Sequence, residues 1–215
     1  MGELIRMAER REARRLRIRR RGASPPAQFF FDLACPFTYL AAERVERSFD
    51  AVVWTPASSA SLQRAAPAAD PLAVEAVRVT AERRATALRM PLSWPDRFPA
   101  EVPAAMRAAS YAVEQGRGAA FVLAAGRLAF CGGFDLEDPE ILAEAAAAAG
   151  VGLDECLRAA GDYSRDGAME AAGRRLLAAG ADRLPALRVG RTLFWGEERA
   201  ADAAWAARVA AQAAN

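Results

Sequence analysis

Residues 28–55 read QFFFDLACPFTYLAAERVERSFDAVVWT, and this stretch decides the fold. Residues 28–33 form a short aromatic run that is typical of a buried strand. Pro36 opens an amphipathic helical pattern that extends to about residue 49, and residues 51–55 have the composition of a second strand. A strand, a helix and a strand in this order predict a β-α-β unit whose two strands lie parallel.

The middle of the chain is predicted to be a helical insertion. Residues 70–180 show apolar positions at helical spacing, and a proline-broken loop at residues 90–99 separates two of the helices. Asp138 followed by Pro139 is a helix-start signal, and Gly150 is placed to end the helix that they begin.

A second pair of strands is predicted near the C-terminus. Residues 186–189 and 192–195 flank a Gly-Arg dipeptide, which favours a tight hairpin turn. The last amphipathic helix is predicted for residues 198–213, with Trp205 and Val209 on its inward face. The complete order is β-α-β, a helical insertion and β-β-α, which is an α/β fold.

The composition removes several kinds of chemistry. The 215 residues include no histidine and no lysine, so all 29 basic residues are arginine. Histidine general bases, Ser/His/Asp triads and histidine metal ligands are therefore excluded, as are lysine Schiff bases. The hydrophobic content of 53% suits a globular chain with a substantial core.

The first 21 residues are strongly basic. They contain nine arginines and three glutamates, whereas the whole chain has a formal net charge of +2, so the remainder is mildly acidic. No apolar run suited to a signal peptide or a membrane span occurs, and we expect a cytoplasmic protein without a membrane partner. No aromatic residue is interleaved with these arginines, so nucleic acid is not the favoured partner. A solvated helix and a partner-binding segment both remain open.

Cys35 is the candidate reactive residue. The three cysteines, Cys35, Cys131 and Cys156, lack the spacing of a zinc site, so no metal is predicted. Cys131 and Cys156 follow apolar or helical patterns and are predicted to be small core residues. Cys35 precedes Pro36 at the predicted tip of the first helix, where unpaired N–H groups and the helix dipole favour a thiolate. We therefore expect the pKa of Cys35 to lie well below about 8.5.

Further residues are candidates for the same site. Thr38 lies one turn after Cys35, where its hydroxyl can donate a hydrogen bond to the sulfur; the alternative is a buried cysteine beside a local cap. Asp32 is either a proton shuttle or a structural cap on the loop. Pro185 precedes a predicted strand, and a cis peptide bond there would leave the backbone of Leu184 free to face a ligand. Three aromatic residues are predicted either to line a substrate cavity or to pack in the core: Trp94, Phe98 and Tyr111.

These motifs, taken in order, resemble the thioredoxin-fold superfamily. The C-P-x-T sequence at a helix tip, the helical insertion, the proline before a strand and the segment FWGEER at residues 194–199 are similar to DsbA-type proteins. They are also similar to the DsbA relatives 2-hydroxychromene-2-carboxylate isomerase and kappa-class glutathione transferase. The resemblance covers about residues 28–212. It implies three parts: a basic extension and linker at 1–27, a thioredoxin-like domain at 28–69 and 181–215, and a helical insertion domain at 70–180.

The resemblance also implies the roles of individual residues. Cys35 takes the position of the nucleophile, Pro185 that of the cis-proline, and Leu184 that of the residue whose backbone pairs with a bound thiol. Gly196 and Glu198 fall where relatives hold the γ-glutamyl end of glutathione. The implied cofactor is thus glutathione or another low-molecular-weight thiol, and relatives are often homodimers. The thiol-binding set is completed by the two residues that follow the nucleophile: Pro36 and Phe37.

Departures from the relatives leave three functions open. The isomerase branch usually has serine at the position of Cys35 and asparagine at that of Glu101, and the DsbA branch has a second cysteine at the position of Thr38. The first interpretation is a DsbA-like thiol oxidoreductase or thiol transferase with a single nucleophilic cysteine. The second is a glutathione-dependent isomerase or conjugating enzyme in which Cys35 or Thr38 orients the cofactor thiol. The third is a binding protein without catalysis.

Overall fold

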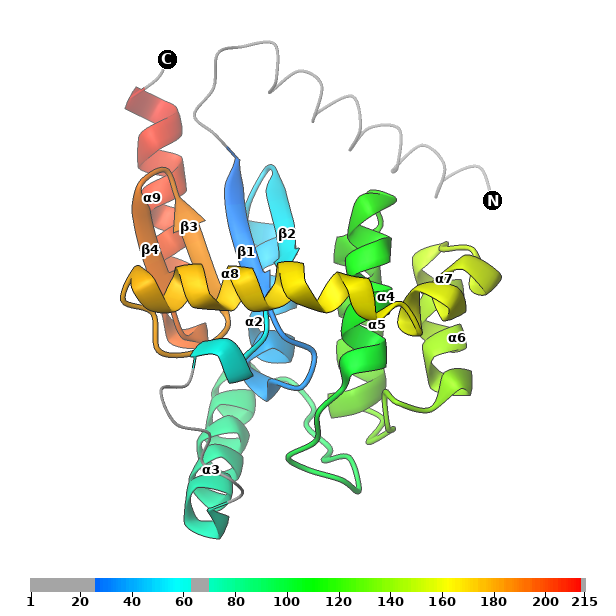
Figure 1. The fold of residues 1–215 in the computed structure, drawn as a ribbon. Coiled ribbons are helices and arrows are strands. Elements are labelled where there is room, and N and C mark those ends of the chain that lie inside the picture. Colours follow the sequence, from blue (N-terminus) through cyan, green and yellow to red (C-terminus); the bar gives the residue numbers. More distant parts are fainter. Residues whose placement is uncertain (1–25, 63–69, 214–215) are drawn as a thin grey trace.

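The computed structural model describes residues 26–62 and 70–213. A four-stranded mixed sheet forms its centre, with helices on both faces and a cluster of further helices at one side (Figure 1). The predicted order β-α-β, helices, β-β-α is confirmed. The basic segment at residues 1–25 lies outside the described residues, so the predictions for it stay predictions.

The sheet has the strand order β2-β1-β3-β4. Its strands are β1 (Ala27–Phe31), β2 (Val52–Pro56), β3 (Ala186–Val189) and β4 (Thr192–Trp195). β1 and β2 are parallel, as the β-α-β pattern predicts, whereas β3 is antiparallel to both β1 and β4. The N-terminal and C-terminal halves of the fold therefore meet where β1 pairs with β3.

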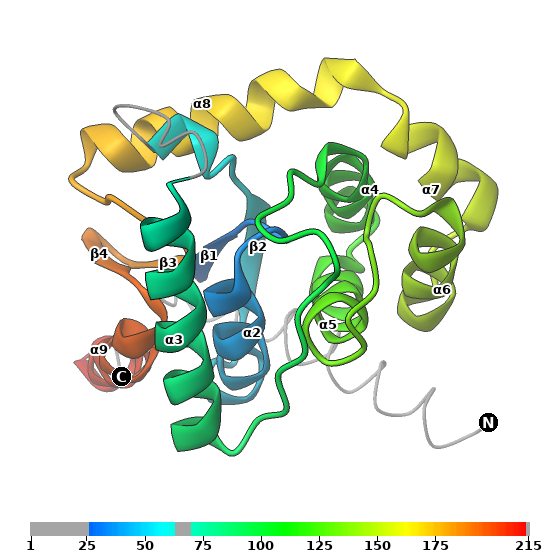
Figure 2. The same cartoon turned by 90° about the horizontal axis from the view of Figure 1, so that it is seen from below.

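Helices cover the two faces of the sheet. α2 (Pro36–Ser48) and α9 (Ala200–Ala213) lie on one face, and α8 (Asp166–Ala178) crosses the other (Figure 2). Successive side chains of a strand point to opposite faces. Accordingly, the β1 residues Phe29 and Phe31 join the core that includes α2, whereas Phe30 packs with residues of α8.

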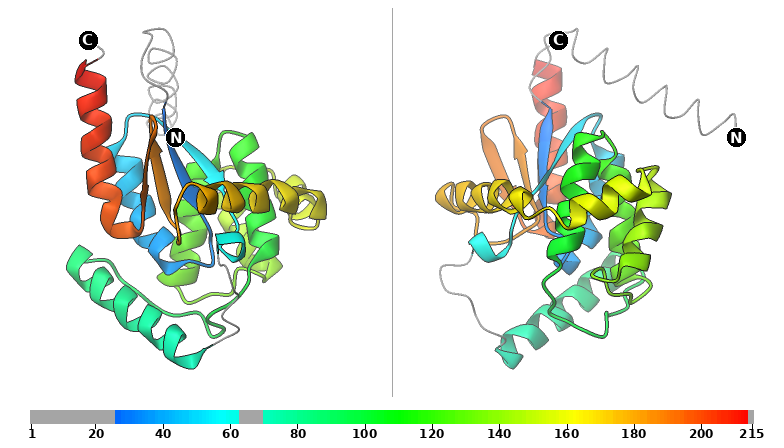
Figure 3. Two further views of the ribbon diagram at one scale, coloured as in Figure 1. Left: turned by 60° about the vertical axis from the view of Figure 1, so that its left-hand side comes forward. Right: turned by 45° about the vertical axis from the view of Figure 1, so that its right-hand side comes forward.

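Five helices between β2 and α8 make up most of the insertion. They are α3 (Pro71–Leu88), α4 (Pro103–Glu114), α5 (Gly118–Phe130), α6 (Pro139–Ala149) and α7 (Leu153–Ala160). The predicted cap signals are confirmed at α6. The Asp138 carboxylate accepts a hydrogen bond from the Glu140 N–H, and Gly150 ends the helix with a φ of 67°. α3 lies apart from the other four, beside the end of the sheet where α2 begins (Figure 3).

Two predictions about buried residues are wrong. Trp205 is 63% exposed and Val209 is 42% exposed, because α9 turns its alanines Ala203 and Ala204 toward the protein and these small residues allow close packing. Cys131 is exposed because α5 ends at Phe130, which leaves the cysteine at the helix cap. Cys156 is fully buried, as predicted.

Two findings concern membranes and metals. None of the helices in residues 26–62 and 70–213 combines the length and the apolar character that crossing a membrane requires. Within the same ranges, no group of three or more acidic or cysteine side chains is arranged to hold a metal ion.

Candidate active site

Cys35 lies where the end of β1 approaches the loop that precedes β3. It is the N-cap residue of α2, in an extended conformation with φ −92° and ψ 116°. Its Sγ donates a hydrogen bond to the Leu184 carbonyl oxygen, 3.4 Å away. The Leu184–Pro185 peptide bond is cis. The fold thus brings together two motifs that are 149 residues apart in the sequence.

The predicted low pKa of Cys35 is wrong. The pKa of this thiol is raised to about 11: burial is the main cause and the nearby charge of Asp32 adds to it, whereas hydrogen bonds from the start of α2 lower the pKa. The N-terminal N–H groups are present as predicted, but the loss of hydration outweighs them. At neutral pH the resting sulfur is therefore a protonated thiol that donates to Leu184.

Thr38 contacts the sulfur from the first turn of α2. Its hydroxyl oxygen accepts from the Asp32 N–H at 3.4 Å, which leaves its own proton free to donate toward Cys35. The hydrogen bond from the Thr38 hydroxyl to the sulfur and those from the Thr38 and Phe37 N–H groups lower the pKa of Cys35, although less than burial raises it. Thr38 is 2% exposed, so its hydroxyl is held in place. Pro36 opens the helix without needing a partner for an N–H.

Asp32 caps the loop between β1 and α2. One carboxylate oxygen accepts from the Ala34 N–H at 2.9 Å and the other accepts from the Ser59 N–H at 2.8 Å. Burial raises the pKa of Asp32 above its ordinary value, and these two hydrogen bonds partly offset the effect. The structural role considered from the sequence is thus observed. The role of proton shuttle stays a prediction.

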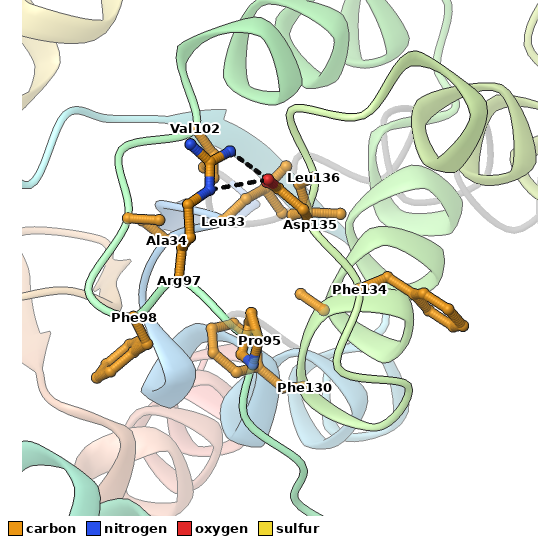
Figure 4. A pocket seen from close by; sticks show the side chains of 12 residues that line it. Leu33, Ala34, Pro95, Arg97, Phe98, Val102, Phe130, Phe134, Asp135 and Leu136 are labelled. Carbon is orange, nitrogen blue, oxygen red and sulfur yellow. Dashed lines mark hydrogen bonds and ion pairs between the residues drawn. The ribbon is translucent and has the colours of Figure 1, made fainter.

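A mainly apolar cavity opens beside the loop that precedes Cys35. Leu33 and Ala34 form one wall, and the residues opposite come from the 95–102 loop, the end of α5 and the loop that follows α5 (Figure 4). The cavity is shallow: its volume is about 20 Å³, room for about one water, and the rest of the depression is open to solvent. At its rim, Arg97 is paired with Asp135. The cysteine loop therefore borders a shallow, mainly apolar depression rather than an enclosed pocket.

The three aromatic candidates have different surroundings. Phe98 lines the cavity. Trp94 packs on Phe98 with ring centroids 4.5 Å apart, and its indole N–H donates to Glu82 of α3. Tyr111 does not line this cavity and packs against the core near Arg165. Only Phe98 therefore meets the cavity prediction directly.

The C-terminal candidates surround the proline loop. The Gly196 N–H donates to the Pro185 carbonyl oxygen at 2.8 Å, and Gly196 adopts a φ of 91°, a conformation that suits glycine. Glu198 is exposed and accepts from Arg183 at 2.8 Å. The Gly196 backbone thus contacts the proline loop of the site, whereas the Glu198 carboxylate is paired with the surface residue Arg183.

Glu197 is the residue that sequence reasoning missed. It is 1% exposed, and its carboxylate pairs with Arg44 of α2 and accepts from Arg84 of α3, the closer contact with Arg84 being 2.7 Å. Glu197 therefore links the cysteine-bearing helix, α3 and the segment after β4. In the sequence it stands beside Glu198 with no feature that marks it as the buried one of the pair.

The raised pKa predicts how Cys35 responds to pH. In a Cys131→Ser variant, the rate of Cys35 alkylation by iodoacetamide should rise about tenfold per pH unit between pH 7 and 10, because only the thiolate reacts. The midpoint should lie near 11. Circular dichroism at each pH verifies that the protein is folded, and a Cys35→Ser/Cys131→Ser double variant gives the background. A rate that levels off below pH 9 would contradict the raised pKa.

Comparisons with known proteins identify the family and agree with the fold. A family model described as a DSBA-like thioredoxin domain matches residues 27–206. Among curated proteins, no sequence matches the chain. Solved structures share the fold at low sequence identity, and three of them are described below.

The first is a 2-hydroxychromene-2-carboxylate isomerase, with a TM-score of 0.75 and 18% identity over 87% of this chain and 97% of that one. The second is a probable DsbA oxidoreductase from Streptomyces coelicolor, with a TM-score of 0.68 and 22% identity over 86% and 88%. The third is a putative protein disulfide isomerase from Nitrosomonas europaea, with a TM-score of 0.59 and 16% identity over 79% and 88%. At these identities the likeness concerns the fold. The family match covers most of the chain, and the chain therefore belongs to the DsbA-like thioredoxin domain family.

Proposed function

We propose that the protein is a thiol transferase or oxidoreductase that uses Cys35 as its single nucleophile and takes glutathione or another low-molecular-weight thiol. The observation that carries this proposal is the contact of the Cys35 sulfur with the Leu184 carbonyl at the cis-proline loop. The mainly apolar depression next to Ala34 gives the rest of a small substrate a surface to pack against.

The proposed reaction is a pair of thiol–disulfide exchanges. Cys35 loses its proton to solvent, and the thiolate attacks one sulfur of a disulfide; an S–S bond forms to Cys35 as the original S–S bond breaks, and the leaving sulfur departs as a thiolate. A second small thiolate then attacks the mixed disulfide and releases Cys35. No net oxidant is consumed, because each cycle converts one disulfide and one thiolate into a different disulfide and a different thiolate, and Cys35 is regenerated.

Within the described residues the other cysteines lie elsewhere in the fold. Cys131 caps the end of α5 and Cys156 is buried in α7. Position 38, one turn from Cys35, carries a hydroxyl. In this proposal the mixed disulfide is therefore resolved by an external thiol.

Oxidised glutathione tests the proposal directly. We expect a lasting glutathione adduct on Cys35, detected by peptide mass spectrometry after free thiols are blocked. A Thr38→Cys variant should instead form an internal disulfide between positions 35 and 38, because residues one helical turn apart are near bonding distance. Cys131→Ser is the matched control and should leave both results unchanged. An unmodified Cys35 at pH 9 would contradict the proposal.

A glutathione-dependent isomerase is the second candidate, and the protonated state of Cys35 favours it. A neutral S–H at a helix tip can donate a hydrogen bond to a bound thiolate, as a serine hydroxyl would. In that mechanism Cys35 orients the cofactor thiol and forms no bond with it. Reversible glutathione binding without an adduct would support this candidate.

A further inference from the structure

A second cavity lies between α2 and α9, on the same face of the sheet as Cys35 but farther along α2. Its walls come from these two helices, which contact each other. The α2 wall consists of Arg44 and Ser48. The α9 wall consists of three alanines and an arginine: Ala200, Ala201, Ala204 and Arg208.

This cavity is separate from the candidate active site. Arg44 comes nine residues after Cys35, and at the rise of an α-helix this places it about 13 Å farther along α2. None of the residues that line the apolar cavity beside Ala34 also lines this one. A ligand in this cavity would therefore not meet the proposed thiol site.

The cavity collects positive charge and hydrogen-bond donors. Two arginines and one serine are among its lining residues, and no acidic residue is. The buried carboxylate of Glu197 fixes Arg44, but that carboxylate is shared with Arg84, so the three groups together keep one positive charge. Within residues 26–62 and 70–213, Arg208 makes neither an ion pair nor a hydrogen bond through its side chain. Together with Arg208, this cluster has an excess of two positive charges, which favours binding of an anion.

The size of the cavity and its donors on two helices favour a tetrahedral oxyanion. Its volume of about 140 Å³ is roughly ten times the 10–15 Å³ that one water needs on the same measure, and the cavity is partly open to solvent. The alanines of α9 leave this space, and the donors reach it from two helices. A planar carboxylate can be satisfied by one guanidinium, whereas a phosphate presents oxygens in several directions and suits donors from both walls.

We propose that the cavity between α2 and α9 binds a phosphate group, held by Arg44, Arg208 and Ser48. Arg44 is preorganised by Glu197, and Arg208 is exposed on α9 and closes over the anion from the other side. The alanines leave the anion room to reach both guanidinium groups. The ligand is inorganic phosphate or the phosphate group of a small monoester.

Calorimetric titration of the full chain with inorganic phosphate tests the proposal, in a buffer without other multivalent anions and at ionic strength held constant with sodium chloride. We expect one saturable site with a dissociation constant in the millimolar range or tighter. Arg208→Ala should weaken binding about tenfold or more, because a charge-assisted hydrogen bond is lost. Arg208→Ala should leave the fold intact, because this side chain is exposed on a helix and alanine is a good helix former.

Two variants locate the site. Arg175→Ala removes an exposed arginine from α8, on the opposite face of the sheet, and should leave the phosphate affinity unchanged. Cys35→Ser should also bind phosphate like the unaltered chain. Absence of saturable binding, equal affinity in Arg208→Ala, or loss of binding in Cys35→Ser would each overturn the proposal. Tighter binding of phenyl phosphate would identify a monoester as the ligand, and tighter binding of phosphate would identify the free anion.

Discussion

Replacing Cys35 by serine is expected to lower the rate of thiol transfer by at least about a thousandfold, because loss of a nucleophile removes the covalent route altogether. A serine hydroxyl is similar in shape and can accept or donate the same hydrogen bonds, so the contact with the Leu184 carbonyl can be kept. Its oxygen does not exchange with disulfides. The measurement is the rate of glutathione-dependent reduction of a small mixed disulfide, followed at pH 9 where the thiolate fraction is larger.

The same variant distinguishes the two candidate functions. If the sulfur only orients a cofactor thiol, serine performs that task, and activity with glutathione is largely retained. Cys131→Ser is the matched control, since Cys131 is an exposed cysteine outside the site, and it should retain the full rate. An equal loss of activity in Cys131→Ser would contradict the assignment of the nucleophile.

Glu197→Ala is expected to destabilise the protein by about 3 kcal/mol, because it leaves two arginines without the buried carboxylate that pairs with them. The carboxylate is 1% exposed, whereas the side chains of Arg44 and Arg84 are 27% and 33% exposed, so part of their charge is still hydrated. For a chain of this size, such a loss lowers the melting temperature by about 6–12 °C. Thermal unfolding followed by circular dichroism measures the change.

Glu198→Ala is the matched control for this prediction. Glu198 is the next residue in the chain, and its pair with Arg183 is half exposed on both sides. Surface ion pairs contribute about 0–1 kcal/mol, so the melting temperature should change by no more than about 4 °C. Equal effects of the two substitutions would show that the ion pairs of Glu197 with Arg44 and Arg84 do not hold α2 and α3 together.

The strands and the main helices could be predicted because their signals are local. The aromatic run of β1, the proline at the start of α2 and the Gly-Arg turn between β3 and β4 each act within a few residues. Which side of α9 is buried could not be predicted from such local signals. Trp205 is the largest apolar residue of that helix, but the alanines pack closer to the protein and determine which side is buried.

The contact between Cys35 and Leu184 could be predicted only from the resemblance to thioredoxin-fold proteins, because 149 residues separate the two positions. The pKa of the thiol could not be predicted from the sequence. The sequence locates Cys35 at a helix start, which predicts a low pKa, but it contains no measure of how far the surrounding chain removes water from the sulfur. Glu197 was missed for a related reason, since its burial depends on arginines from two other helices.

The position of β1 at the centre of the sheet has a consequence during synthesis on the ribosome. β1 can pair with β2 once residue 56 has emerged, but its other neighbour, β3, begins only at residue 186. Until then the nascent chain presents one open edge of β1 and lacks the Leu184 carbonyl, so the cysteine is more hydrated than in the finished protein. We therefore expect the thiol to react faster with oxidants before the C-terminal hairpin is in place than after it.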